Sequence, residues 1–301
     1  MIASPQDLIR PELLELTAYH VPHANGMIKL DAMENPYHLP ESLRDVVADV
    51  AHDVALNRYP DASATELKNV LRQSMNIPAD CDIVLGNGSD ELIQILAMGL
   101  AKPGAALLAL EPSFVMYKMI ARFCGLRYIG VPLGRNFSLD VNELLATIAR
   151  EQPALIFIAY PNNPTGNLFS ADDVESVLKS ASGVVVIDEA YTPFAGQSFM
   201  PRATEFPNLI VMRTLSKLGL AALRLGYMVG AKSWMTEFEK LRLPYNTGSL
   251  TQAIAARVLT SAKELEDQAK AIVAERGRVA ADLATMGGVM VFPSQANFLL
   301  L

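Results

Sequence analysis

The sequence has few of the residues that build disulfide frameworks or metal sites. Only two of its 301 residues are cysteine, Cys81 and Cys124, and two thiols make no disulfide framework. We therefore expect two reduced thiols in or near the core of a cytoplasmic protein. The four histidines all lie in the first sixth of the chain, and none is spaced with a cysteine or glutamate in a metal-ligand pattern. The sequence thus predicts no metal site.

Long apolar runs and blocks of like charge are also missing. The longest apolar stretches, such as residues 105–110 and 154–159, have the length of buried strands and are too short to span a membrane. The N-terminus has no basic segment followed by an apolar one, so no signal peptide is predicted. The net charge is −7, from 25 Lys and Arg against 32 Asp and Glu, which argues against nucleic-acid binding. We expect a soluble cytoplasmic protein that binds neither membranes nor nucleic acid.

Between about Glu41 and Tyr245 the chain alternates between short apolar runs and helical patterns. The apolar runs predict strands at residues 83–85, 106–110, 128–131, 155–160, 184–187, 209–212 and 227–229. Helices are predicted at residues 90–100, 114–124, 141–150 and 171–180. Near-continuous apolar strands that alternate with helices indicate an α/β fold, with a parallel sheet covered by helices on both faces.

The two ends of the chain differ from this middle part. Residues 1–40 are irregular and rich in proline and histidine, which is typical of an arm lying across another part of the protein. Residues 249–284 predict a long amphipathic helix with a break near Ser261, and two apolar runs at 289–292 and 297–301 then predict strands. We expect an arm at 1–40 that forms part of a small domain, a large domain at 41–245, and a small α+β domain at 246–301. The chain ends inside the last predicted strand, which favours a truncated sequence over a native end.

One lysine lies where a ligand is expected. Lys217 follows the predicted strand at 209–212, and ligands bind at the carboxyl ends of strands in open α/β sheets. Its neighbours are mostly small and apolar, so partial desolvation would lower its pKa and make it a better nucleophile towards an aldehyde. A lone loop lysine is more often a solvated surface charge. The functional interpretation therefore depends on the residues that accompany it.

Two other strand ends carry groups that could hold a pyridine ring. Asp188 ends an apolar run, where it could cap the next turn or pair with a protonated ring nitrogen. Tyr191 and Asn163 could both bind a phenolic oxygen of the same ring. Each residue alone has an ordinary structural explanation. Together with Lys217 they favour a site for pyridoxal 5'-phosphate (PLP).

A phosphate-binding turn is predicted near Gly88. Glycine lets the backbone approach a ligand, and the helix that begins near Asp90 offers free N–H donors. A single Gly-x-Gly is weak evidence, but Ser216 and Arg224 would add two phosphate ligands. Tyr117, in the next strand–helix unit, could stack on the ring, although alone it would be taken for a core residue.

The motifs at 162–166, 188–191 and 216–217 resemble, in this order, those of the PLP-dependent aminotransferases of fold type I. The resemblance extends over essentially the whole chain. It implies the fold of that family, a mostly parallel seven-stranded sheet with helices on both faces and a smaller α+β domain. It is closer still to the histidinol-phosphate aminotransferases of histidine biosynthesis. The segments that carry this narrower resemblance are residues 16–22, 29–36, 57–61, 86–91, 216–220 and 295–298.

The resemblance implies a role for each candidate residue. Lys217 would hold PLP as a Schiff base, while Asp188 would face the ring nitrogen. The other cofactor ligands would be Asn163 and Tyr191 at the ring oxygen, Gly88, Ser89, Asp90, Ser216 and Arg224 at the phosphate, and Tyr117 on the ring face. Tyr59 would reach the cofactor of a partner subunit, which implies a homodimer with shared active sites. Tyr19 and Asn35 would border the substrate pocket.

The implied reaction converts L-histidinol phosphate and 2-oxoglutarate into imidazole acetol phosphate and L-glutamate. The arginines that bind substrate carboxylate or phosphate in this family are expected beyond Leu301.

Three alternative functions stay open. An aminotransferase for aromatic or other amino acids would keep every cofactor residue, and a lyase similar to threonine-phosphate decarboxylase would need no oxo-acid acceptor. A non-catalytic ligand-binding domain of a regulator would carry a DNA-binding domain, and none precedes residue 41.

Overall fold

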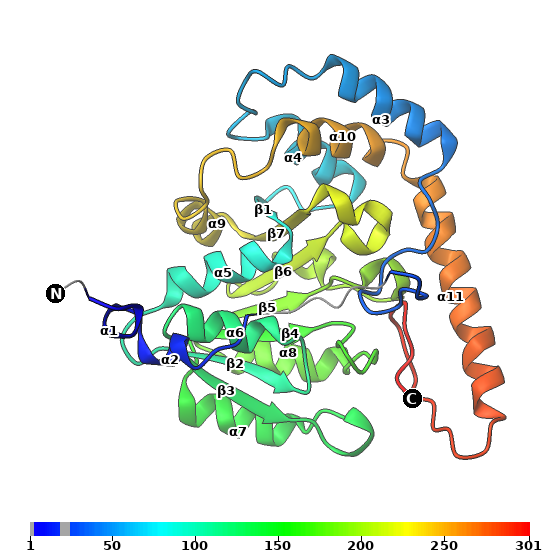
Figure 1. Cartoon of the computed structure of the whole chain (residues 1–301). Coiled ribbons are helices and arrows are strands. Elements are labelled where there is room, and N and C mark those ends of the chain that lie inside the picture. Colours follow the sequence, from blue (N-terminus) through cyan, green and yellow to red (C-terminus); the bar gives the residue numbers. More distant parts are fainter. Residues whose placement is uncertain (1–2, 19–24) are drawn as a thin grey trace.

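A mixed β-sheet runs through the centre of the computed structural model, which describes residues 3–18 and 25–301 (Figure 1). The strands of the described chain are β1 Cys81–Asn87, β2 Ala106–Glu111, β3 Arg127–Pro132, β4 Leu155–Ala159, β5 Val184–Asp188, β6 Leu209–Thr214 and β7 Leu225–Ala231. They form one seven-stranded sheet in the order β1-β7-β6-β5-β4-β2-β3. Only β7 is antiparallel to its neighbours, so the predicted mostly parallel sheet is confirmed.

Helices cover the sheet on both faces (Figure 1). Their bounds are α1 Pro5–Leu8, α2 Pro11–Leu14, α3 Glu41–Asp53, α4 Thr65–Ser74, α5 Ser89–Leu100, α6 Met116–Phe123, α7 Val141–Glu151, α8 Ala171–Ser180, α9 Lys232–Glu239, α10 Ser249–Leu259 and α11 Lys263–Ala284. Helices α5, α6 and α9 pack on one face, and α3, α4, α7, α8 and α10 contribute to the core of the other. The four helices predicted between strands correspond to α5, α6, α7 and α8.

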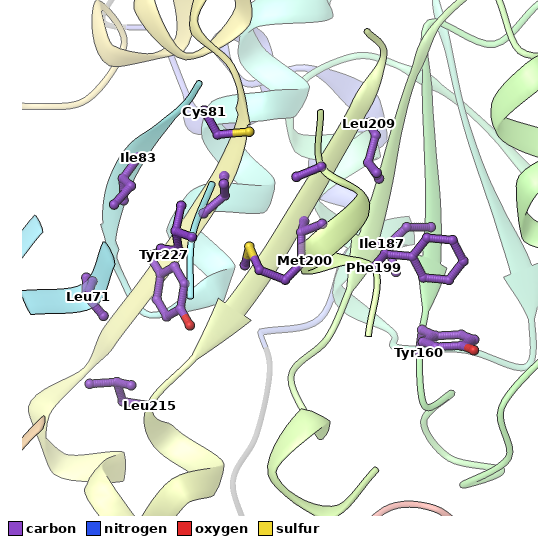
Figure 2. Packing of buried hydrophobic residues seen from close by; sticks show 14 of the residues in the cluster. Leu71, Cys81, Ile83, Tyr160, Ile187, Phe199, Met200, Leu209, Leu215 and Tyr227 are labelled. Carbon is purple, nitrogen blue, oxygen red and sulfur yellow. The ribbon is translucent and has the colours of Figure 1, made fainter. Parts of the chain in front are cut away.

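The apolar strands divide their side chains between two cores. In β4, Ile156 and Ile158 join one hydrophobic cluster while Leu155 and Phe157 join the other, because successive side chains of a strand point to opposite faces. Figure 2 shows part of the first cluster, with Ile187 of β5 on that face. A strand buried on both faces must be apolar along its whole length. Polar groups are therefore left to the strand ends.

The ends of the chain fit the expectations only in part. The arm contains two short helices, α1 and α2, where irregular structure was expected. The long C-terminal helix is interrupted between α10 and α11, as predicted. The two strands expected at 289–292 and 297–301 are wrong: these segments lie beside each other, and the amide of Phe292 donates to the carbonyl of Leu300 at 3.0 Å, but they form no sheet. An isolated two-stranded ribbon is only marginally stable in water.

In the described ranges no helix has the length and apolar character needed to cross a bilayer.

The sheet brings the candidate residues to one edge. Strands β1 to β6 run in the same direction, so their carboxyl ends lie together. Asp188 ends β5, and Lys217 follows β6. On β7, Gly226 lies against the turn between β1 and α5. A Cβ atom there would be 2.6 Å from the carbonyl carbon of Gly88 and 2.7 Å from the amide nitrogen of Ser89.

We expect Gly226→Ala to destabilise the protein, because the added methyl group would meet backbone atoms that cannot rotate away. The free energy of unfolding should fall by about 1–3 kcal/mol, the usual cost of overpacking, in a urea titration. Gly277→Ala is the matched control, since Gly277 lies within α11 with open space around it and should gain about 0.5–1 kcal/mol. Equal stability of Gly226→Ala and the wild type would contradict this packing argument.

Candidate active site

The carboxyl edge of the sheet borders a cavity of about 550 Å³. The predicted residues in its wall are Ser89, Asp90, Tyr117, Asn163, Asp188, Tyr191, Ser216, Lys217 and Arg224. Residues of the wall that the sequence analysis did not single out include Asp31, Ala32, Met33, Phe114 and Thr214. The cavity thus combines side chains from several strand ends with a short stretch of the N-terminal arm.

Lys217 lies in a short π-helical segment, Ser216–Leu220, directly after β6. Its Nζ donates a hydrogen bond to the carbonyl oxygen of Ala32 at 2.7 Å and lies 5.6 Å from the centroid of the Tyr191 ring. Burial lowers the pKa of Lys217, although the carboxylates of Glu34 and Asp90 oppose this shift. A larger fraction of the amine is therefore neutral and nucleophilic than in a surface lysine.

Asp188 is a buried carboxylate held by two hydrogen bonds. Its Oδ2 accepts from the phenol of Tyr117 at 2.6 Å, and its Oδ1 accepts from the backbone N–H of Ala190 at 3.1 Å. Burial raises the pKa of Asp188 to about 6, and the two hydrogen bonds act against that rise. The group can stay ionised at neutral pH in the apolar end of the cavity, where it would attract a cationic ring nitrogen.

Asn163 and Tyr191 form a pair on the loops that follow β4 and β5. The side-chain amide of Asn163 donates to the phenol oxygen of Tyr191 at 3.1 Å. The Tyr191 ring meets the edge of Phe298, with centroids 5.2 Å apart and planes at 81°. Burial raises the pKa of Tyr191, so its phenol stays protonated and can donate to a ligand oxygen.

The predicted phosphate site combines a glycine turn with an arginine. Gly88 has φ +80°, and a Cβ atom there would lie 2.6 Å from Nη2 of Arg224, so only glycine leaves room for this approach. Arg224 Nη1 donates to the hydroxyl of Ser216 at 3.4 Å, and its Nη2 lies 4.0 Å from the carboxylate of Asp90. Ser89 begins α5, whose first N–H groups have no partner within the helix. Together these groups make a site suited to an anion.

Tyr117 occupies a different place from the one expected. Its side chain is fully buried and its ring lies flat on Phe157, with centroids 4.5 Å apart and planes at 11°. It therefore has no exposed ring face to offer a ligand. Phe114, which meets the edge of the Tyr117 ring at 5.6 Å, lines the cavity and is the better candidate for stacking. The signal that could have indicated Phe114 is an aromatic residue just beyond the carboxyl end of a strand.

Asn35 and Tyr59 are not part of the cavity wall. The Nδ2 of Asn35 donates to Oε1 of Gln268 at 3.0 Å, and the arm reaches the cavity through residues 31–33 instead. Tyr59 is 80% exposed and stacks on Tyr245, with ring centroids 4.6 Å apart. Tyr19 lies outside the described residues.

Comparison with known proteins identifies the family to which this site belongs. The profile of the family "Aminotransferase class I and II" matches residues 25–301. The chain therefore belongs to the class I and II aminotransferases, and it is an enzyme.

Individual relatives carry a more particular name. The chain is 53% identical to "Histidinol-phosphate aminotransferase 1" of Ralstonia nicotianae over 98% of its own length and 80% of that relative's. It is 54% identical to "Histidinol-phosphate aminotransferase" of Chromobacterium violaceum, over 97% and 82% of the two chains. The solved histidinol-phosphate aminotransferase of Sinorhizobium meliloti, in complex with pyridoxal-5'-phosphate, superimposes with a TM-score of 0.86 at 24% identity, over 97% and 81% of the two chains. This last similarity supports the fold.

The pKa of Asp188 generates a prediction for the ligand-free protein. The folded-state pKa of about 6 exceeds the ordinary value of 3.8, so the protonated carboxyl favours folding at low pH, and this contribution is lost as the pH rises through 6. Asp188→Asn is neutral at every pH. Its free energy of unfolding at pH 8 should therefore exceed that of the wild type by on the order of 3 kcal/mol, from about 1.4 kcal/mol per pH unit.

The same comparison near pH 4 should show a difference below about 1 kcal/mol, because the carboxyl is then protonated in the folded protein and the pH lies close to its ordinary pKa of 3.8 in the unfolded chain. Urea titrations at the two pH values measure the effect. Asp172→Asn, on the exposed side of α8, is the control and should show no comparable pH-dependent gain. A variant Asp188→Asn that is no more stable than the wild type at pH 8 would contradict the assignment.

Proposed function

We propose that this enzyme binds PLP in the cavity and catalyses transamination between L-histidinol phosphate and 2-oxoglutarate. The observation that carries the proposal is the placement of the Lys217 amine and the buried Asp188 carboxylate in the wall of one cavity. Two further observations support the proposal. The chain belongs to a family of aminotransferases, and its relatives named for histidinol phosphate share 53% and 54% of their residues with it.

The residues of the cavity fit PLP group by group. Asp188 would pair with the ring nitrogen, and the Asn163–Tyr191 pair would bind the ring oxygen. The anion site near Gly88 has the opening, the hydroxyl groups and the guanidinium that a phosphate requires. When bound, PLP supplies a ring that withdraws electrons from the substrate's α-carbon.

The chain's own residues would then position the substrate and move its proton. Lys217 has a pKa lowered by burial, so its Nζ would be able to take the proton from the substrate's α-carbon and give it to the cofactor carbon that had carried the aldehyde. Asp188 keeps a negative charge at the ring nitrogen while this happens. Phe114 would cover one ring face and exclude water, and Arg224 with Ser216 would hold the phosphate in place.

The choice of histidinol phosphate as substrate rests on the relatives and on the N-terminal arm. Residues 31–33 of the arm line the cavity, and they belong to one of the segments that resemble the histidinol-phosphate enzymes. A sister aminotransferase would share the cofactor residues and differ in this part of the wall. The substrate test below therefore includes L-phenylalanine and L-threonine phosphate.

We expect Lys217→Ala to lose transamination, because no other lysine among the described residues lines the cavity and could move the α-proton. Loss of a general acid and base lowers kcat by about 10²–10⁴-fold, and loss of the covalent cofactor link lowers it further. The measurement is the absorption spectrum of PLP-loaded protein after addition of L-histidinol phosphate, followed by 2-oxoglutarate. The wild type and the control Lys232→Ala, an exposed residue at the start of α9, should convert the cofactor and then restore it.

Near-normal turnover by Lys217→Ala would overturn the catalytic assignment. Conversion by L-phenylalanine but not by L-histidinol phosphate would overturn the substrate and favour a sister enzyme. Release of carbon dioxide from L-threonine phosphate without an oxo acid would favour a lyase.

We also propose the domain division expected from the sequence, with an arm at 1–40, a large domain at 41–245 and a small unit at 246–301. The sheet and its covering helices support the large domain. The arm and the last segment pack together beside the cavity, where the side-chain amide of Asn297 donates to the carbonyl of Met33 at 2.9 Å. Met33 and Phe298 join Tyr191 in one small hydrophobic cluster.

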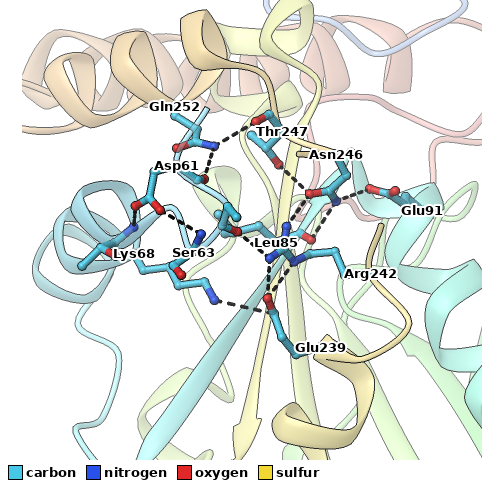
Figure 3. Close-up of polar contacts among 12 residues, drawn as sticks. Asp61, Ser63, Lys68, Leu85, Glu91, Glu239, Arg242, Asn246, Thr247 and Gln252 are labelled. Atoms are coloured by element: carbon cyan, nitrogen blue, oxygen red, sulfur yellow. Dashed lines mark hydrogen bonds and ion pairs between the residues drawn. The ribbon is translucent and has the colours of Figure 1, made fainter. Parts of the chain in front are cut away.

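A homodimer with shared active sites forms the last part of the proposal. Tyr59 lies outside its own chain's cavity and is exposed. Its loop is nevertheless fixed, because Gln252 donates to the carbonyl of Asp61 at 3.0 Å and Arg242 donates to the carbonyl of Ala62 at 2.7 Å (Figure 3). A rigid, exposed aromatic residue is suited to contact a second copy of the chain.

Mixed dimers test whether Tyr59 serves the partner's site. Tyr59→Ala and Lys217→Ala should each be poorly active alone. After subunits are mixed and exchanged, half of the dimers should be hybrids with one intact site of two, so about a quarter of the wild-type activity should return. Each variant exchanged with itself is the control and should recover no activity. Absence of any recovery, with exchange verified by mass spectrometry, would overturn the shared site.

A further inference from the structure

Tyr117 and Asp188 form a buried, hydrogen-bonded pair in the wall of the cavity. Tyr117 lies on α6 and Asp188 ends β5, and the phenol donates to Oδ2 of the carboxylate at 2.6 Å. The Tyr117 ring is held by Phe157, which lies flat against it, and by Phe114, whose ring stands at 85° to it. The phenol therefore has one orientation, and that orientation is directed at the carboxylate.

The direction of this hydrogen bond determines its effect. Burial and the neighbouring Asp188 raise the pKa of Tyr117 well above its ordinary value, so the proton stays on the phenol. The other charged or ionisable groups that face Asp188 are Asp90 and Glu189, whose charges favour its neutral form, and Tyr191. Tyr117 is thus the side chain that favours the ionised form of Asp188, with help from the Ala190 amide.

We propose that Tyr117 is a positioning residue, whose phenol keeps Asp188 ionised and fixed in orientation so that the carboxylate can pair with the ring nitrogen of the cofactor. The inference rests on the proposed function, because that function assigns Asp188 to the ring nitrogen. It replaces the stacking role that the sequence suggested for Tyr117. It also explains why the fully buried ring of Tyr117 has a hydroxyl group at the wall of the cavity.

The variant Tyr117→Phe isolates the phenol, because the ring contacts with Phe157 and Phe114 are kept. The first readout is the titration of the Asp188 carboxyl carbon by NMR in ligand-free protein labelled at aspartate, with Asp188→Asn used to assign the signal. A lost charge-assisted hydrogen bond should move the titration midpoint upwards by about 1–2 pH units. Tyr160→Phe is the matched control, since that buried tyrosine donates to Gln197 at 2.8 Å and should leave the midpoint unchanged.

The second readout is the dissociation constant of PLP at pH 7, which Tyr117→Phe should raise about tenfold, in step with the partial loss of the Asp188 charge. An unchanged midpoint would overturn the role of Tyr117 and leave the proposed function intact. A raised midpoint with unchanged PLP affinity in both Tyr117→Phe and Asp188→Asn would instead overturn the assignment of Asp188 to the ring nitrogen. Urea titration of Tyr117→Phe verifies that the variant is folded. If it unfolds at the same urea concentration as the wild type, the NMR titration and the PLP affinity can both be interpreted without a change in stability.

Discussion

Burial of the central sheet on both faces is the constraint on which the rest of the structure depends. Strands such as β4 and β5 bury every side chain, so they can carry no polar group along their length. Polar groups are confined to the carboxyl ends, and the shared direction of six strands brings those ends to one edge. Asp188, Asn163 and Lys217 lie close together for this reason. The site is thus a consequence of how the core is built.

Burial of the strands also means that the polar groups of the site reduce the stability of the folded protein. Asp188 is the last residue of a buried strand, and an ionised carboxylate there opposes folding. Two hydrogen bonds reduce that cost without removing it. Residues that destabilise the ligand-free protein and serve a ligand are common in active sites, where function rather than stability selects the side chain. The phenol of Tyr117 is likewise a buried polar group, and its hydrogen-bond acceptor is the Asp188 carboxylate.

The cavity is completed by chain segments from outside the sheet. Ala32 accepts from Lys217 over a sequence separation of 185 residues, and Asn297 reaches Met33 across 264. These contacts hold the arm and the last segment beside Tyr191. Lys217 is therefore held by the sheet on one side and by the arm on the other, and the arm residues that line the cavity lie in one of the segments that carry the narrower resemblance.

The sequence by itself determined the seven strands of the sheet, helices α5 to α8 and the candidate residues at strand ends, because continuous apolar runs and the residues that follow them are local features. It also indicated Lys217, Asp188, Asn163 and Tyr191 as members of one cavity. Only the tertiary structure decided the antiparallel direction of β7, the position of Phe114 in the wall and the contact of Tyr117 with Asp188, 71 residues away. Such contacts depend on how a helix crosses the sheet. Packing of the whole core sets that crossing, and no local pattern encodes it.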